Sequence, residues 1–181
     1  MSATPEHLNL RRLDDGFGHY LAGLIDGEGC FTIPRASARP DQATHSYQCR
    51  FELGLRDDDL AILEEIQQRT GLGRLSPRSG KSSSRRNRPS IRWDIGSRRD
   101  CAGLVQILDR YPLRAKKAAD YAIWRRAVSA WLRLSTSRYM GPERWDEIAA
   151  LSTALRAIRA YDGAPVALPT SFQLALVGSG R

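Results

Sequence analysis

The chain has 181 residues, of which 41% are apolar, and it carries 28 lysines and arginines against 20 aspartates and glutamates. This length and composition suit one well-buried domain, and no apolar run reaches the roughly eighteen residues that a membrane-spanning helix needs. The charge of +8 favours a nucleic-acid partner, although an anionic membrane surface or solubility alone would also suit it.

The first predicted elements are a helix and two strands. Apolar residues recur at helical spacing over residues 17–26, and the glycines of 27–29 are expected to end this helix. Residues 30–33 predict a strand, and the polar stretch 34–46 predicts a loop or a frayed strand end. Residues 47–56 alternate as a strand, with apolar and polar side chains on opposite faces.

The middle of the chain predicts a second helix and two more strands. Asp57–Asp59 precede a helix that ends at Gly71. A metal site is one interpretation of this acidic run, but capping of the helix start is preferred. Strands are predicted at 74–78 and 90–95, and the polar, basic segment 79–89 between them is either a solvated loop or, preferably, an arm that follows phosphates.

The remainder of the chain is predicted to be helical. Helices are expected over 100–108, 116–134 and 142–161. The order of elements predicts an α+β fold, an αββαββα core whose four-stranded antiparallel sheet is covered by helices on one face, with additional C-terminal helices. A single domain is expected over residues 1–162, followed by a tail over 163–181.

The cellular location of the protein is predicted from its N-terminus and from the spacing of its cysteines. The N-terminus has no apolar core of a secretory signal. Cys30, Cys49 and Cys101 are too widely spaced to form a metal-ligand pair or a disulfide framework. We therefore expect a cytoplasmic protein that does not associate with membranes.

The most distinctive segment is residues 20–31, Tyr-Leu-Ala-Gly-Leu-Ile-Asp-Gly-Glu-Gly-Cys-Phe. It resembles the signature of the LAGLIDADG homing endonucleases nearly letter for letter, and the resemblance extends over about residues 17–130. It implies that the uncovered sheet face is a saddle that binds double-stranded DNA. By the same resemblance Glu28, the last acidic residue of the motif, binds a divalent metal, and Gly27 contributes its backbone carbonyl.

The implied cofactor is Mg²⁺, with Mn²⁺ expected to substitute, because carboxylate and carbonyl oxygens suit such ions. Metals beside a scissile phosphate activate water and stabilise the leaving oxygen. With one motif copy, the resemblance implies a homodimer acting on a roughly palindromic site. Small motif residues allow helices to approach closely, either between subunits or against the sheet of one subunit. The expected dimer interface is Leu21, Ala22, Gly23, Ile25 and Asp26.

A second segment, residues 111–124, begins Tyr-Pro-Leu-Arg-Ala-Lys-Lys and resembles a family stretch that places a basic side chain near the scissile phosphate. Lys117, Lys116 and Arg125 are the candidates, and each is equally well explained as a solvated helix residue. Leu55 departs from the family, which often has a water-positioning glutamine there. Leucine cannot hydrogen-bond water.

Contacts to DNA are expected from the polar sheet face and the basic loop, where arginine pairs with guanine and glutamine with adenine. A solvent-facing strand edge is the alternative for each residue. The expected set is Thr32, Gln48, Arg50, Glu52, Arg78, Lys81, Arg85, Arg86, Arg92 and Asp94.

Three functions compete. The preferred one is a homing endonuclease that makes double-strand breaks by Mg-dependent phosphodiester hydrolysis and serves intron or intein mobility. The second is a non-cutting nucleic-acid-binding protein of the same fold, either a maturase that binds intron RNA or a transcription regulator. The retained Glu28 argues against a regulator, whereas Leu55 argues for one. A basic scaffold protein, the third, leaves the motif unexplained.

Overall fold

The computed structural model describes residues 13–36, 46–78, 89–136 and 142–160. The helices are α1 (Asp15–Glu28), α2 (Leu60–Thr70), α3 (Arg98–Arg110), α4 (Lys117–Thr136) and α5 (Asp146–Ala157), with short 3-10 helices η2 (Asp57–Asp59) and η3 (Pro142–Trp145). The strands are β1 (Gly29–Thr32), β2 (Arg35–Ala36), β3 (Ser46–Tyr47), β4 (Arg50–Arg56), β5 (Arg74–Arg78) and β6 (Ser90–Ile95).

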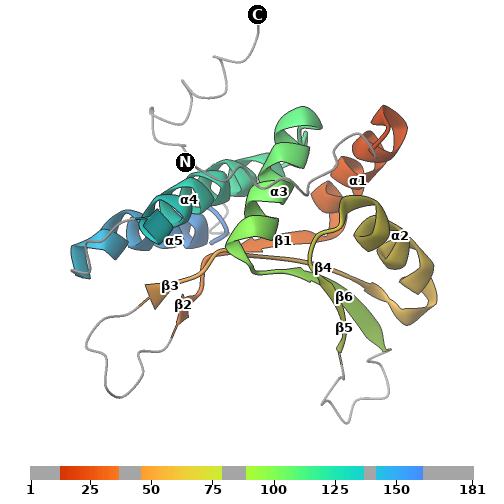
Figure 1. Cartoon of the computed structure of the whole chain (residues 1–181), viewed down its shortest axis with the longest axis horizontal. Helices are drawn as coiled ribbons and strands as arrows, with labels where there is room; N and C mark the ends of the chain where they lie inside the picture. Colours follow the sequence, from red (N-terminus) through yellow and green to blue (C-terminus); the bar gives the residue numbers. More distant parts are fainter. Residues whose placement is uncertain (1–12, 37–45, 79–88, 137–141, 161–181) are drawn as a thin grey trace, which may run out of the picture.

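Four strands form an antiparallel sheet in the order β1-β4-β6-β5. The helices lie on one face of this sheet, and no helix of the described residues covers the other face (Figure 1). This arrangement confirms the predicted α+β class and the four-stranded sheet with one open face. In the described part of the chain, no helix has the length and apolar character needed to cross a membrane.

The core lies between the sheet and its helices. Phe31, Phe51 and Trp93, from three adjacent strands, have no exposed surface. Phe31 also contacts Trp124 of α4, with ring centroids 5.2 Å apart. Burying each such side chain contributes about 1.5–3 kcal/mol. A hydrogen bond of 2.7 Å from the Ser152 hydroxyl to the Ile33 carbonyl fixes α5 against the end of β1.

The second predicted strand is interrupted, which corrects the sequence-based boundary. Tyr47 pairs with Arg35 in a separate two-stranded sheet, and β4 begins only at Arg50. Gln48, between the two, donates its N–H to the Pro34 carbonyl. The stretch 34–46, predicted to be a loop or a frayed strand end, contains β2 close after β1. The alternation of apolar and polar residues over 47–56 continues across this break. It predicts which face each side chain occupies but not which strand the backbone pairs with, so it could not predict the break.

Helix ends also differ from the predicted ones. Helix α1 continues through Gly27 to Glu28, and Gly29 follows it in extended backbone with φ −68°. Asp59 occupies the N-cap position of α2, so the acidic run does stand at a helix start as predicted, but no side chain of η2 makes the expected capping hydrogen bond. Gly71 does end α2 in the left-handed region at φ 65°, where glycine has no steric penalty. Ser97, whose side chain accepts from the Asp100 N–H, caps α3.

Candidate functional site

Helix α1 has one packed and one open face. Phe17, Leu21 and Ile25 pack into the core. On the other face Tyr20 is 49% exposed, an unusual exposure for a large apolar side chain among the described residues. A Cβ added at Gly23 or Gly27 would meet nothing within 4 Å. The described part of one chain therefore leaves this glycine-bearing face open.

The packed face corrects part of the predicted dimer interface. Leu21 and Ile25 have no exposed surface and Ala22 only 4%, because they pack within their own chain. Leu21 and Ile25 are therefore not available to contact a second chain, whereas Gly23 is exposed and lines an open hollow together with Ala22 and Asp26. Asp26 binds within the chain as well: its Oδ2 accepts the N–H groups of Arg114 at 2.7 Å and of Ala115 at 3.1 Å.

Glu28 is the last residue of α1, and its carboxylate is exposed. Its position is fixed by Gly29, where a Cβ would lie 2.7 Å from the Ile25 carbonyl oxygen and 2.9 Å from the Phe51 ring. The Glu28 carboxylate makes no ion pair or hydrogen bond with the described residues. It lines a hollow at the sheet, whose other lining residues are Gly54, Leu55, Arg56, Asp59, Ser90 and Arg92.

Of the three predicted basic residues, Lys117 lies nearest the motif. Its ammonium group, in the first turn of α4, donates a hydrogen bond to the Gly29 carbonyl, one residue from Glu28. Lys116 is exposed beside it. The short connection between α3 and α4 is held to the end of α1 by Asp26 and so brings these lysines to the motif.

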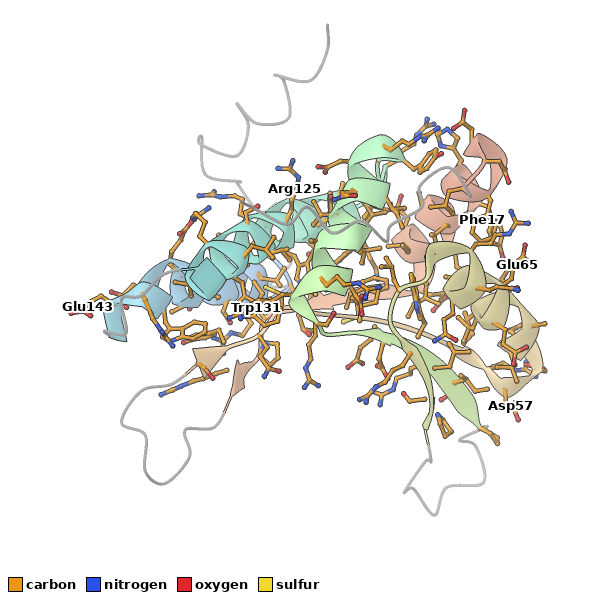
Figure 2. The ribbon with its side chains drawn as sticks, in the orientation of Figure 1. Phe17, Asp57, Glu65, Arg125, Trp131 and Glu143 are labelled. Carbon is orange, nitrogen blue, oxygen red and sulfur yellow. The ribbon has the colours of Figure 1, made fainter. Side chains whose placement is uncertain are left out.

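Arg125 does not belong to this group, which corrects its prediction as a catalytic candidate. It lies about 12 Å farther along α4 than Lys117. Its guanidinium forms two hydrogen bonds of 2.8 Å with the Asp109 carboxylate of α3, on the side of α4 away from the sheet (Figure 2). The Tyr121 hydroxyl donates to the same carboxylate, and burial raises the pKa of that phenol. Arg125 thus joins two helices.

The donors present near Glu28 fit a hard divalent cation. Glu28 offers a carboxylate, and Gly27 lies in the last turn of α1, where carbonyls lack an intrahelical partner. The described residues contain no group of three or more His, Cys, Asp or Glu side chains placed to hold a metal. The two oxygens suit Mg²⁺, which retains several waters and accepts phosphate as a ligand.

The open sheet face carries the predicted polar residues in cross-strand rows. Thr32 pairs with Arg50 in one row, and in the next Glu52 pairs with Asp94. An ion pair of 3.2 Å connects Arg92 with Glu52. Gln48, just before β4, accepts a hydrogen bond from Arg50. These predicted residues therefore share one surface, from which polar side chains project (Figure 2).

Sequence reasoning missed three residues of this face. Arg56, Arg74 and Ser76 lie on it because they share strand parity with predicted neighbours. The period-2 pattern of the strands was the signal that identifies them. For Arg78 the structure describes only the backbone. The predicted contacts Lys81, Arg85 and Arg86 lie outside the described residues, as does the tail over 163–181.

Comparison with known protein families decides the relationship. The model of the LAGLIDADG endonuclease family matches residues 21–128, more than half of the chain. The chain belongs to the LAGLIDADG endonuclease family. Its motif helix is α1, and the uncovered sheet is the sheet of that family's fold.

Curated LAGLIDADG relatives are longer proteins. The chain is 35% identical over 107 residues to probable intron-encoded endonuclease 3 of Neurospora crassa. This match covers 59% of the present chain and 19% of the relative. It is 25% identical over 111 residues to probable intron-encoded endonuclease Cox1-I1b of Schizosaccharomyces pombe, and this match covers 61% of the present chain and 27% of the relative. The matched region therefore spans about a quarter or less of each relative.

Solved LAGLIDADG structures share the fold. The meganuclease I-AabMI, in a crystal structure with uncleaved DNA, is 26% identical with a TM-score of 0.63, and the match covers 87% of this chain and 48% of that one. The homing endonuclease I-TnaI matches with a TM-score of 0.63 at 18% identity, and the match covers 78% of this chain and 95% of the I-TnaI chain. The present fold thus corresponds to about half of I-AabMI and to nearly all of I-TnaI.

Proposed function

We propose that this chain is a site-specific endonuclease that cuts both strands of duplex DNA by Mg-dependent hydrolysis and acts as a homodimer. The observation that carries the proposal is the position of Glu28. Glu28 ends the motif helix, makes no hydrogen bond or ion pair with the described residues and lines a hollow at the open sheet face. An exposed carboxylate without such a partner supports metal binding, because the end of the helix does not require an acidic group.

DNA is the substrate that the surface supports best. The open sheet face presents Arg50, Arg56, Arg74 and Arg92, and the whole chain has a charge of +8. Arginine provides planar donors for phosphates and for guanine edges. I-AabMI, which has the same fold at 26% identity, was crystallised with uncleaved DNA. The acidic Glu52 and Asp94 add acceptors for cytosine and adenine amino groups.

The open face of α1 supports a homodimer. Gly23 and Gly27 leave room for a second helix at close range, and Tyr20 beside them is half-exposed. The fold also corresponds to 48% of the I-AabMI chain, so two copies would supply a surface of that extent. A twofold contact through α1 brings the two Glu28 carboxylates together, one for each DNA strand.

In the proposed reaction each residue has a separate part. Glu28 and the Gly27 carbonyl would hold the Mg²⁺, which supplies an activated water and stabilises the leaving oxygen when bound. Lys117, which donates to the Gly29 carbonyl, would stabilise the charge that develops on the phosphate. Asp26 holds the backbone of Arg114 and Ala115 and so keeps α4 in register with the motif helix.

The test is incubation with duplex DNA that spans the uninterrupted insertion site of its gene. Mg²⁺ should support cutting of both strands, Ca²⁺ should support binding alone, and Glu28→Gln should bind without cutting. A Gly23→Leu variant should sediment as a monomer if α1 forms the dimer contact. Cutting that persists in Glu28→Gln would contradict the assigned role of this carboxylate.

A non-cutting protein of the same fold, a maturase or a regulator, is the second candidate. Leu55 favours it, because this residue borders the hollow beside Glu28 and its apolar side chain, which packs against the core, can position no water there. Such a protein would bind nucleic acid tightly in Mg²⁺ and in Ca²⁺ and cut under neither condition. Tight, uncleaved binding to the duplex in both ions would therefore favour this candidate.

A further inference from the structure

The hollow beside Glu28 has a polar lining that the proposed reaction does not use. Arg56 and Arg92 border it from adjacent strands, together with Ser90. We propose that this hollow binds one backbone phosphate of the DNA duplex between the guanidinium groups of Arg56 and Arg92. The proposal rests on the proposed function for its ligand, since it takes duplex DNA as the molecule that lies on the open sheet face.

The strand register creates the space. Gly54 pairs with Arg92 and Arg56 pairs with Ser90, so these four positions share the open face of β4 and β6. Gly54 has no side chain, which leaves the sheet surface between the two arginines uncovered. A Cβ added at Gly54 would lie 3.6 Å from the Arg92 Cγ, an ordinary contact, so a larger residue fits the fold but would occupy the hollow.

Both guanidinium groups are held in place by carboxylates outside the proposed phosphate position. Arg56 pairs with Asp58 of η2, and Arg92 pairs with Glu52 at 3.2 Å. The Arg92 Nε atom is buried and lies 3.9 Å from the Asp94 carboxylate, so only the terminal guanidinium nitrogens of Arg92 can reach a phosphate. The pair of Arg56 is exposed and therefore weak, and the pair of Arg92 is partly buried. A guanidinium has five N–H donors, so these pairs leave further donors of each arginine unoccupied. A planar guanidinium with free donors matches the oxygens of a phosphate.

The neighbouring groups favour the arginine side of the hollow. Lys117 does not line the hollow, and Leu55 offers no donor. Asp59 and Glu28 also line it: the charge of Asp59 repels a phosphate from its own side, and the charge of Glu28 is offset when a divalent cation is bound. A phosphate between Arg56 and Arg92 would lie beside Glu28 and would fix the duplex relative to the motif helix.

The experiment measures how binding depends on salt, so it does not require cleavage. Affinity for a mixed-sequence duplex is measured in Ca²⁺ between 50 and 200 mM salt for wild type, Arg56→Gln and Gly54→Val. Loss of one phosphate contact should lower the slope of log affinity against log salt by about 1 in both variants. Gly54→Val keeps every charge and suits a strand, so only filling of the hollow explains its effect. Arg133→Gln, on α4 and paired with Glu147, is the matched charge control and should keep the wild-type slope.

The outcomes separate the two proposals. An unchanged slope in Arg56→Gln would overturn the phosphate site. A reduced slope in Arg56→Gln with an unchanged slope in Gly54→Val would also overturn it, since the phosphate would then lie outside the hollow. A reduced slope in Arg133→Gln equal to that of Arg56→Gln would also overturn it. Wild-type protein that binds no duplex DNA would contradict the proposed function itself. Circular dichroism of each variant verifies that it is folded.

Discussion

Replacing Gly29 with alanine should damage both the fold and the site. The backbone at Gly29, with φ −68°, tolerates alanine, so the cost arises from contacts. The added methyl group would lie 2.7 Å from the Ile25 carbonyl oxygen and 2.9 Å from the Phe51 ring. Ile25 and Phe51 are fully buried and cannot move away freely. Overpacking of this kind costs about 1–3 kcal/mol.

Urea unfolding followed by circular dichroism, at one fixed protein concentration, measures this cost. Gly54→Ala is the matched control: its methyl group makes an ordinary contact, and alanine should stabilise the strand by about 0.5–1 kcal/mol relative to glycine. Gly29→Ala should also cut DNA more slowly than its stability alone explains, because Glu28 and Lys117 are both positioned by this residue. Equal stability of wild type and Gly29→Ala would refute the packing at the end of α1.

Three further predictions concern the lysines and the cysteines. Lys117→Gln should lower the single-turnover cleavage rate by roughly 10²-fold, with DNA affinity little changed. Lys116→Gln should leave the rate within a few-fold of wild type. Quench-flow measurement of the cleavage rate distinguishes the two variants. In the native protein iodoacetamide should label Cys30, which is exposed, and spare Cys49 and Cys101, which are buried, and mass spectrometry would reveal any equal labelling that contradicts this. Burial raises the pKa of the Cys49 thiol from 9.0 to about 12. Between these pH values the unfolded chain releases a proton that the native chain keeps, so the free energy of unfolding should fall as pH rises above 9. Urea titrations at pH 8 and 10 should show a smaller fall for Cys49→Ala than for wild type, and an equal fall would contradict this.

Much of the fold could be predicted because it depends on local periodicity. The alternation of β4 and β6 placed Glu52 and Arg92 correctly on the open face, and Gly71 marked the end of α2. The break before β4 could not be predicted, because Tyr47 keeps the strand parity while it pairs with a different strand.

The site was less accessible to sequence reasoning because its geometry depends on long-range packing. The motif showed that α1 contains small residues, but not which face of the helix packs within its own chain. Gly18 lies against the Tyr111 ring, which would be 2.3 Å from an added Cβ, and Leu21 is fully buried. Leu21 therefore points into the core rather than toward a second chain. The pairing of Arg125 with Asp109 joins two helices and leaves no signal in either one. The nearness of Arg56 to Glu28 follows from the register of β1 and β4.

The most direct test of the central claim uses mixed dimers. A supercoiled plasmid that carries the uninterrupted insertion site is incubated in Mg²⁺ with wild type, with Glu28→Gln, and with a mixture of the two refolded together. If each Glu28 serves one strand, wild type should give linear plasmid, the variant should leave it supercoiled, and the mixture should accumulate nicked circles. Nicked circles absent from the mixture, or linear plasmid formed by Glu28→Gln alone, would contradict a catalytic dimer built on two Glu28 carboxylates.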